Sequence, residues 1–307
     1  MRFTLQYPLS TSDPDPEFAT PSVVRDLAQA AEESGFDAVA FTEHPAPDDG
    51  WYSTGGHASF DPVVALAFCA AATTRIRLMT YLLVLPYHNP FAAAKSLISL
   101  DRLSEGRLAV VAGAGYLAGE FANLGVPHEE RNARFDEGLE ALRAVWSSGG
   151  RPVTFEGRFF RGHDLVSSPA PVQEHLPILI GGNSRASRRR AALHGGWSPL
   201  MASPKRSDRM STAAIGTLEQ LAAGIEEVRA LARDAGRADA PPIQAQTLQR
   251  RFMNEWTDEA EHLEHLRAVE ALGVESFVTQ IAGLSARETI ERVRRYGSEI
   301  IAAHRAG

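Results

Sequence analysis

The sequence predicts a (β/α)8 barrel with a small hairpin insertion, and two observations carry this prediction. Short apolar segments typical of buried strands alternate with helical segments, eight times over 307 residues. The joints also repeat, because 32–41 (EESGFDAVAF) and 270–279 (EALGVESFVT) both run from a helix end through a glycine into an apolar strand. A doubly wound open sheet is the main competing fold. No obvious linker divides the chain, so we expect one barrel domain over residues 1–307.

Eight segments are expected to form strands because they are apolar or alternate between apolar and polar residues. The first strand carries Phe3, Leu5 and Tyr7. The other seven are expected at 37–41, 76–85, 108–112, 177–180, from Trp197, 243–248 and 276–281. The segment 152–160 (PVTFEGRFF) is predicted to be a hairpin inserted before the fifth strand.

Helix start signals separate these strands. Thr20, Asp61 and Asn89 each precede a proline, which combines a polar cap with a residue suited to the first helical position. Thr217 with Gln220, and Ser285 with Glu288, have the spacing of capping boxes. Helices are predicted at 21–34, from 62, 90–103, 131–146, 184–194, 217–235, from the cap Thr257 to 271, and from 285 onward.

Composition excludes several classes of protein. A net charge of −7 and a pI near 5.8 argue against nucleic-acid binding, and the run 188–190 (RRR) is expected on a solvated helix face. The apolar run 63–72 is far shorter than the ~20 residues of a membrane helix. The single cysteine, Cys69, lies in an apolar segment and is expected to be a buried thiol. No signal peptide is apparent at the N-terminus, so we expect a cytoplasmic protein that acts on a small molecule.

In a barrel, the loops after the strands build the active site. Glu43 and His44 follow the strand 37–41, and a histidine tuned by a carboxylate exchanges protons near neutral pH. A structural histidine bonded to backbone is an equal alternative. Trp51, Tyr52 and Phe60 in the following loop are expected to wall an apolar substrate pocket.

Two glycine-containing loops also follow strands. Gly181, Gly182, Asn183 and Ser184 lie between a strand and a helix, a pattern that favours an anion site for a cofactor phosphate over a plain capped turn. The stretch 113–116, Gly-Ala-Gly-Tyr, matches part of a dinucleotide fingerprint, but no second strand ending in an acid follows. Its glycines are instead expected to let the backbone approach a flat ligand.

Other catalytic classes find little support. The segment 182–186 lacks the closing glycine of a nucleophile elbow, which disfavours a serine hydrolase. His262 and His265 do not have a zinc-binding spacing and are expected on a solvated helix face, so no metal site is predicted. Met201 follows the sixth strand and is assigned to the substrate pocket, and the loop-like segment 201–216 is a candidate lid.

Five segments, 30–44, 74–108, 111–146, 155–160 and 177–197, resemble the bacterial luciferase-like oxidoreductases, and particularly the branch that uses the deazaflavin coenzyme F420. The similarity covers roughly residues 1–200, with a fainter match at 268–282. It implies a (β/α)8 barrel that binds a flavin or deazaflavin at the carboxyl ends of its strands. Relatives usually form homodimers through helices of the first half.

The resemblance also implies roles for individual residues. His44 would donate or accept a proton at the reactive ring edge, and Glu43 stands where many relatives have Asp. Thr80 and Tyr81 would lie at an unusual backbone bulge against the ring. The remaining cofactor contacts would come from Gly113, Ala114 and Gly115 under the tail, Tyr116 in the pocket, and Gly181, Gly182, Asn183 and Ser184 around the phosphate.

Together these observations favour an oxidoreductase that transfers hydride to or from F420. Tyr116 replaces the glutamate of sugar-phosphate dehydrogenase relatives, which argues against a glucose-phosphate substrate. The alternative is an FMN-dependent monooxygenase using the same residues, and in either case a flavin or F420 reductase is a possible electron source. A non-catalytic flavin carrier and a barrel hydrolase are the remaining classes.

Overall fold

The computed structural model describes residues 1–9, 16–209, 212–246, 258–283 and 285–307. These residues fall into two compact units. Unit 1 contains 1–9, 16–40 and the described residues from 178 onward, and unit 2 contains 41–177. The expectation of a single domain over 1–307 stays a prediction.

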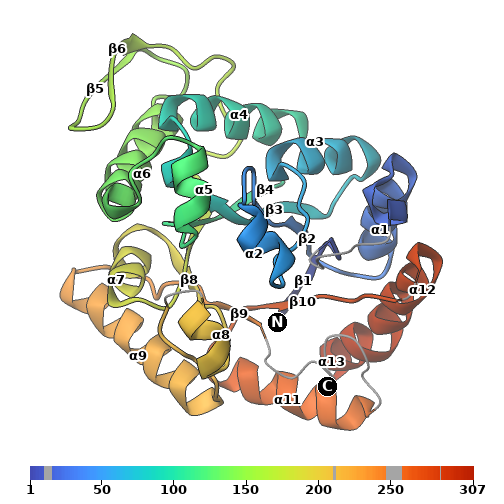
Figure 1. The fold of residues 1–307 in the computed structure, drawn as a ribbon. Coiled ribbons are helices and arrows are strands. Elements are labelled where there is room, and N and C mark those ends of the chain that lie inside the picture. The colour runs from blue at the N-terminus through green and yellow to red at the C-terminus, as the bar shows by residue number, and fades with distance from the viewer. Residues whose placement is uncertain (10–15, 210–211, 247–257, 284) are drawn as a thin grey trace. The chain divides into compact units, whose positions relative to one another are not determined.

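Within the described residues, eight parallel strands alternate with helices, which is the order of a (β/α)8 barrel and confirms the predicted fold class (Figure 1). The strands are β1 (Arg2–Gln6), β2 (Ala38–Phe41), β3 (Arg77–Val84), β4 (Leu108–Gly113), β7 (Ile178–Gly181), β8 (Gly196–Ser198), β9 (Gln244–Gln246) and β10 (Ser276–Thr279). The predicted hairpin is also present, as β5 (Val153–Glu156) and β6 (Arg161–Leu165), which pair antiparallel. Its second strand begins just after the predicted segment 152–160 ends.

In unit 1, parallel strands pair in the order β2–β1–β10–β9, and β7 pairs with β8. A bridge between Trp197 and Ile243 joins the segments of β8 and β9. The helices of this unit are α1 (Pro21–Glu33), α7 (Arg185–His194), α8 (Pro204–Arg209), α9 (Leu218–Asp234), α11 (Glu259–Ala271), α12 (Ala286–Tyr296) and α13 (Ala302–Ala306). Helix α1 packs on α12 and α7 on α9.

In unit 2, β3 and β4 form a parallel pair. The helices are α2 (Asp49–Ser53), α3 (Pro62–Ala72), α4 (Pro90–Leu103), α5 (Ala118–Asn123) and α6 (Arg131–Ser147). Helix α3 packs on β3, and α4 contacts both α3 and α6. Cys69 of α3 is buried as predicted, and burial raises the pKa of its thiol to about 12.

The predicted caps confirm most helix starts. Asp61 accepts from the Val64 amide (N···O 2.9 Å), and Asn89 caps α4 in the same way. Thr217 accepts from the Gln220 amide at 3.2 Å. Thr20 is an exception, because its hydroxyl donates to a backbone carbonyl instead. Thr257 lies outside the described residues, and Asp258 supplies the cap of α11.

Two predicted solvated faces are only partly solvated. In the run 188–190, Arg189 is exposed as predicted, but Arg190 is buried and Arg188 forms an ion pair with Glu227 at 2.7 Å. His262 is also buried, and its Nε2 lies 2.8 Å from the Tyr296 hydroxyl. The positions 262, 266 and 269 share one face of α11, so the helical period turns this histidine toward the core. Burial lowers the pKa of His262 to about 4.

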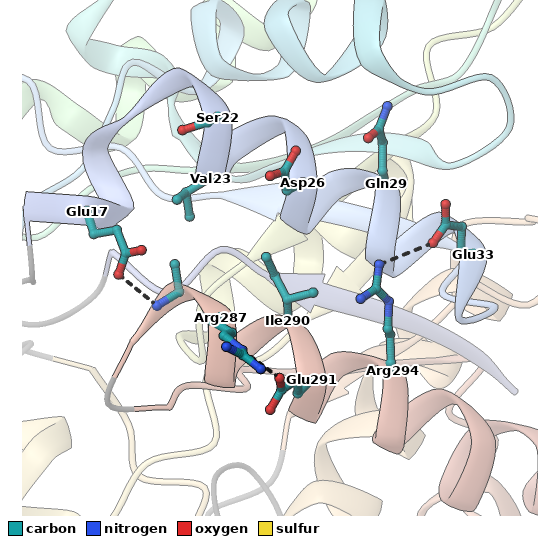
Figure 2. Close-up of a pocket in the computed structure, with 11 residues that line it drawn as sticks. Glu17, Ser22, Val23, Asp26, Gln29, Glu33, Arg287, Ile290, Glu291 and Arg294 are labelled. Atoms are coloured by element: carbon teal, nitrogen blue, oxygen red, sulfur yellow. Dashed lines mark hydrogen bonds and ion pairs between the residues drawn. The ribbon is translucent and has the colours of Figure 1, made fainter.

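A groove of about 520 Å³ lies between α1 and α12 of unit 1 (Figure 2). Charged side chains line much of it, and Arg294 reaches Glu33 across it at 3.7 Å. This ion pair is largely exposed, so it contributes little to stability. None of the predicted site residues lines the groove. Among the described residues, no helix is long and apolar enough to span a bilayer.

The packing of α9 on Trp197 generates the first prediction. A Cβ at Gly224 would lie 2.5 Å from the buried indole, whereas one at Gly138, in α6, would meet its nearest neighbour at 3.5 Å. Gly224→Ala should therefore lower the free energy of unfolding by about 1–3 kcal/mol, the cost of overpacking a core. Gly138→Ala, the matched control, should raise it by up to about 1 kcal/mol through helix propensity. Urea denaturation of both variants checks this, and equal effects would contradict it.

Candidate active site

His44 follows β2 and begins a loop of unit 2 that Ser59 closes. The His44 amide donates to Ser59 Oγ (N···O 2.9 Å), and this hydroxyl donates back to the His44 carbonyl at 3.3 Å. The imidazole is 11% exposed, so it is largely shielded but still open to a ligand. The backbone position of the histidine is thus fixed by its own loop.

The carboxylate that contacts His44 belongs to Glu120 of α5, a residue that was not predicted from the sequence. Glu120 Oε2 lies 3.2 Å from His44 Nδ1 and accepts from the Tyr87 hydroxyl at 2.9 Å. Its Oε1 accepts from the Ala46 amide at 3.0 Å. The side chain is 1% exposed. One signal in the sequence could have indicated Glu120. It is an acidic residue four positions after Tyr116, in the first turn of a short helix.

This contact distinguishes the two ring nitrogens of His44. A carboxylate accepts hydrogen bonds and does not donate them, so Nδ1 carries the proton that Glu120 receives. Nε2 has no hydrogen-bond partner among the described residues. In the neutral ring Nε2 can accept a proton, and in the charged ring it can return one.

Glu43 does not contact His44, contrary to the prediction that it tunes this histidine. Its Oε2 accepts from the Val84 amide at 2.5 Å, and its Oε1 lies 2.7 Å from His88 Nε2. Burial lowers the pKa of His88, but the hydrogen bond and charge of Glu43 outweigh it, and the pKa is raised overall. Glu43 therefore anchors the end of β3.

The bulge expected in β3 is present. The register against β4 shifts between Tyr81 and Leu83, and the Tyr81–Leu82 peptide bond is cis. Tyr81 and Leu82 are half-buried in a strand whose neighbouring residues are buried. The Thr80 side chain is fully buried and exchanges hydrogen bonds with the Val111 backbone, so it is engaged within the sheet.

The glycines at the end of β4 allow close packing within the protein. A Cβ at Gly113 would lie 2.9 Å from Leu82, and one at Gly115 would lie 2.6 Å from Val84. Gly115 also has φ +74°, which favours glycine. These contacts account for the two glycines without a ligand. Ala114, between them, is half-buried.

Aromatic rings surround the His44 imidazole. The Trp51 ring lies 4.4 Å away between centroids, His57 lies 4.9 Å away and Tyr116 lies 6.3 Å away. Trp51 and Tyr116 were predicted near the site, whereas His57 was not. Phe60 packs toward Phe41, with 6.5 Å between ring centroids. Tyr52, also assigned to the pocket, is half-buried on α2.

The loop 181–184 belongs to unit 1. Gly182 has φ +103°, and Ser184 Oγ caps α7 by accepting from the Ser187 amide at 3.1 Å. Asn183 is buried, and its amide group exchanges hydrogen bonds with the backbone of Leu200 and donates to a second carbonyl. The Asn183 side chain is thus engaged by neighbouring backbone, and its role at a cofactor phosphate stays a prediction.

The segment after β8 is more ordered than predicted. Met201 is buried. The candidate lid 201–216 contains α8, and Ala202 and Ile215 form an antiparallel bridge, while 210–211 lie outside the described residues. Among the described residues, no group of three or more His, Cys, Asp or Glu side chains could hold a metal ion.

The Glu43–His88 pair generates a prediction on pH. Because the folded-state pKa of His88 is raised, the stability it provides is full below the ordinary histidine pKa of about 6.5 and is lost as pH rises through the folded value. His88→Gln should therefore destabilise the protein most near pH 6, by about 1–3 kcal/mol as for a hydrogen bond to a charged group. The difference should shrink above pH 8. Urea denaturation across this range measures it, and a constant difference would show that charge plays no part.

Comparison with known proteins identifies the family. The profile of luciferase-like monooxygenases matches residues 3–250. An FMNH2-dependent dimethylsulfone monooxygenase from Pseudomonas putida is 35% identical over 181 residues, covering 56% of this chain and 47% of that protein. The chain thus spans about half the length of this relative, and it spans 64% of other curated relatives that are 34% identical.

Solved structures share the fold over nearly the whole chain. The monooxygenase RslO1 from Streptomyces bottropensis has a TM-score of 0.77 and 22% identity, with 99% of this chain and 100% of that chain covered. An F420-dependent secondary alcohol dehydrogenase has a TM-score of 0.73 and 16% identity, with 98% of both chains covered. These likenesses show the fold, and the profile match over most of the sequence shows the family. The chain belongs to the luciferase-like monooxygenase family.

Proposed function

We propose that this protein is an oxidoreductase that transfers hydride between F420 and a small organic substrate, with His44 exchanging the substrate proton. The observation that supports the proton role is the largely buried imidazole whose Nδ1 is held by Glu120 while Nε2 has no described partner. The choice of F420 rests on the resemblance of the sequence to the F420-dependent branch. A general acid–base needs such a poised atom.

The residues of unit 2 suit a flat, ring-shaped cofactor. Tyr81 and Leu82 interrupt the buried face of β3 with half-buried side chains on an irregular backbone. Tyr116 and Trp51 add aromatic surface around His44. Apolar and aromatic surface with a few placed polar groups is typical of cofactor and substrate sites.

The bound cofactor would supply the hydride chemistry, and the protein would manage the proton. If the substrate is an alcohol, His44 Nε2 would accept the hydroxyl proton as the bound cofactor takes up the hydride from the same carbon. In the reverse direction Nε2–H would return the proton to the carbonyl oxygen. Trp51, whose ring lies 4.4 Å from the imidazole, would limit the access of water to this exchange.

A second candidate is an FMN-dependent monooxygenase, favoured by the FMNH2-dependent relative that is 35% identical. This reaction would require a flavin reductase to supply reduced FMN. Titration of the purified protein with F420 and with FMN, followed by absorbance, distinguishes the candidates. We expect F420 to bind at least tenfold more tightly, a difference of about 1.4 kcal/mol. Tight FMN binding together with oxygen-dependent product would support the second candidate instead.

Replacement of His44 tests the proton role. His44→Gln should lower kcat by about 10²-fold or more, as loss of a general acid–base does, while the Kd for F420 changes little. Bleaching of F420 by a panel of small alcohols, beginning with 2-propanol, measures turnover. His163→Gln is the matched control, because His163 is 72% exposed on the hairpin. If the His44 variant retains full turnover with any substrate that the wild type uses, the proton role is wrong.

We also assign the cofactor phosphate to the backbone of Gly181–Ser184, where α7 begins after β7. FMN should then bind at least about tenfold more tightly than riboflavin, which lacks the phosphate. Gly182→Ala should reduce this ratio, because the added Cβ would lie 3.0 Å from Ser187 Oγ at a φ of +103°. Gly236→Ala, with φ +74° but open space around its Cβ, controls for backbone strain. Equal binding of FMN and riboflavin would contradict the assignment.

The homodimer and the cytoplasmic location implied by the sequence stay predictions.

A further inference from the structure

We infer that Glu120 and Tyr87 are a positioning pair that fixes the tautomer of His44 and so keeps Nε2 as the working nitrogen. This inference rests on the proposed function, because that function makes His44 the proton-exchanging group. Neither residue was a candidate from the sequence.

Glu120 is a fully buried carboxylate that accepts hydrogen bonds from three donors in unit 2. Oε2 lies within hydrogen-bond distance of both His44 Nδ1 and the Tyr87 hydroxyl, and Oε1 accepts from the Ala46 amide. A carboxylate offers only acceptors, so the Nδ1–H form of His44 is the one that matches it. The alternative Nε2–H form would set a lone pair on Nδ1 against a buried negative charge.

Tyr87 also helps to hold the Glu120 carboxylate in place. Its ring packs edge-on against Phe121 at 4.7 Å, and its hydroxyl donates to the same oxygen that faces His44. Burial, and then the neighbouring Glu120, raise the pKa of Tyr87 above its ordinary value, so the hydroxyl stays protonated. The tyrosine is therefore a permanent donor that orients Glu120.

A purely structural role for Glu120 is the competing explanation. Asn123, on the same helix, donates to the Ala46 carbonyl at 3.0 Å, so α5 holds the loop after His44 by two separate contacts. Removing either contact would loosen the loop. Only the loss of the carboxylate would change the tautomer of His44, and this difference separates the explanations.

The variant Glu120→Gln has a defined outcome. The Ala46 amide is a fixed donor, so the carboxamide oxygen should face it and the NH2 group should face His44 and Tyr87. The Tyr87 hydroxyl can rotate to accept, and His44 Nδ1 can accept only after its proton moves to Nε2. The substitution should therefore convert His44 from the Nδ1–H to the Nε2–H tautomer without a change of side-chain size.

Nitrogen NMR of the full chain with 15N-labelled histidine measures this directly at about pH 9, above the ordinary histidine range. We expect the Nδ1–H form in the wild type and the Nε2–H form in Glu120→Gln. The signals that disappear in His44→Gln are assigned to His44. Acylation of His44 by diethyl pyrocarbonate, followed by mass spectrometry, gives a second readout because the reagent attacks an unprotonated ring nitrogen. The reaction should be at least about tenfold slower in Glu120→Gln, where Nε2 carries the proton. A hydrogen bond to a charged group favours one tautomer by about that ratio.

Two further variants complete the test. Asn123→Ala removes only the loop contact and should leave both the tautomer and the acylation rate unchanged. Tyr87→Phe should keep the Nδ1–H form but, by freeing the carboxylate, broaden the His44 signals. An unchanged tautomer in Glu120→Gln, or the same change in Asn123→Ala, would overturn the positioning role.

The tautomer measurements and the turnover measurements can fail independently of each other. If the tautomer changes in Glu120→Gln but His44→Gln retains turnover, the positioning pair stands and the proton role of His44 fails. If His44→Gln abolishes turnover while Glu120→Gln keeps the wild-type tautomer, the proton role stands and the positioning pair fails.

Discussion

The arrangement of the candidate active site depends on one buried carboxylate. Glu120 is 1% exposed in its side chain, and an unpaired charge in that position would be strongly unfavourable. Donors from His44, Ala46 and Tyr87 satisfy it. The loop after β2, the segment after β3 and helix α5 therefore meet at one anion, and their relative positions within unit 2 follow from its hydrogen bonds.

The sequence suggests Glu43 as the acid beside His44, but in the structure Glu120 contacts His44 and Glu43 binds the end of β3. Glu43 is next to His44 in the chain, but the two side chains have different partners. The carboxylate of Glu43 accepts from the amide of Val84 at the end of the bulged strand and forms a hydrogen bond with His88. The acid beside His44 comes from 76 residues further along the chain.

The features that could be predicted from the sequence are those set by local chemistry. Helix α4 begins and ends where the Asn89–Pro90 cap and the apolar period place it, at Pro90 and Leu103. Capping residues act on amides two or three positions away, so a single sequence contains the whole interaction. The fold class followed because it depends on the order of such elements.

The features that could not be predicted depend on distant contacts. Asn183 reads as a phosphate ligand in sequence, but its amide group is taken up by the backbone of the loop around Leu200. Gly113 and Gly115 are predicted to underlie a ligand, and the structure adds that they make room for Leu82 and Val84. In each case a small or polar residue at a strand end is equally compatible with a ligand and with a neighbouring loop, and only tertiary packing decides.

The arrangement around His44 is compatible with either candidate cofactor. A histidine with one nitrogen held by a buried acid and the other left to exchange a proton serves hydride transfer and oxygen insertion alike. Nothing in the bonds among His44, Glu120 and Tyr87 favours either reaction. If His44 is the proton-exchanging group, the choice of chemistry would reside in the bound ring and in the substrate pocket proposed around Trp51, and the proton-handling residues would meet a requirement common to both reactions.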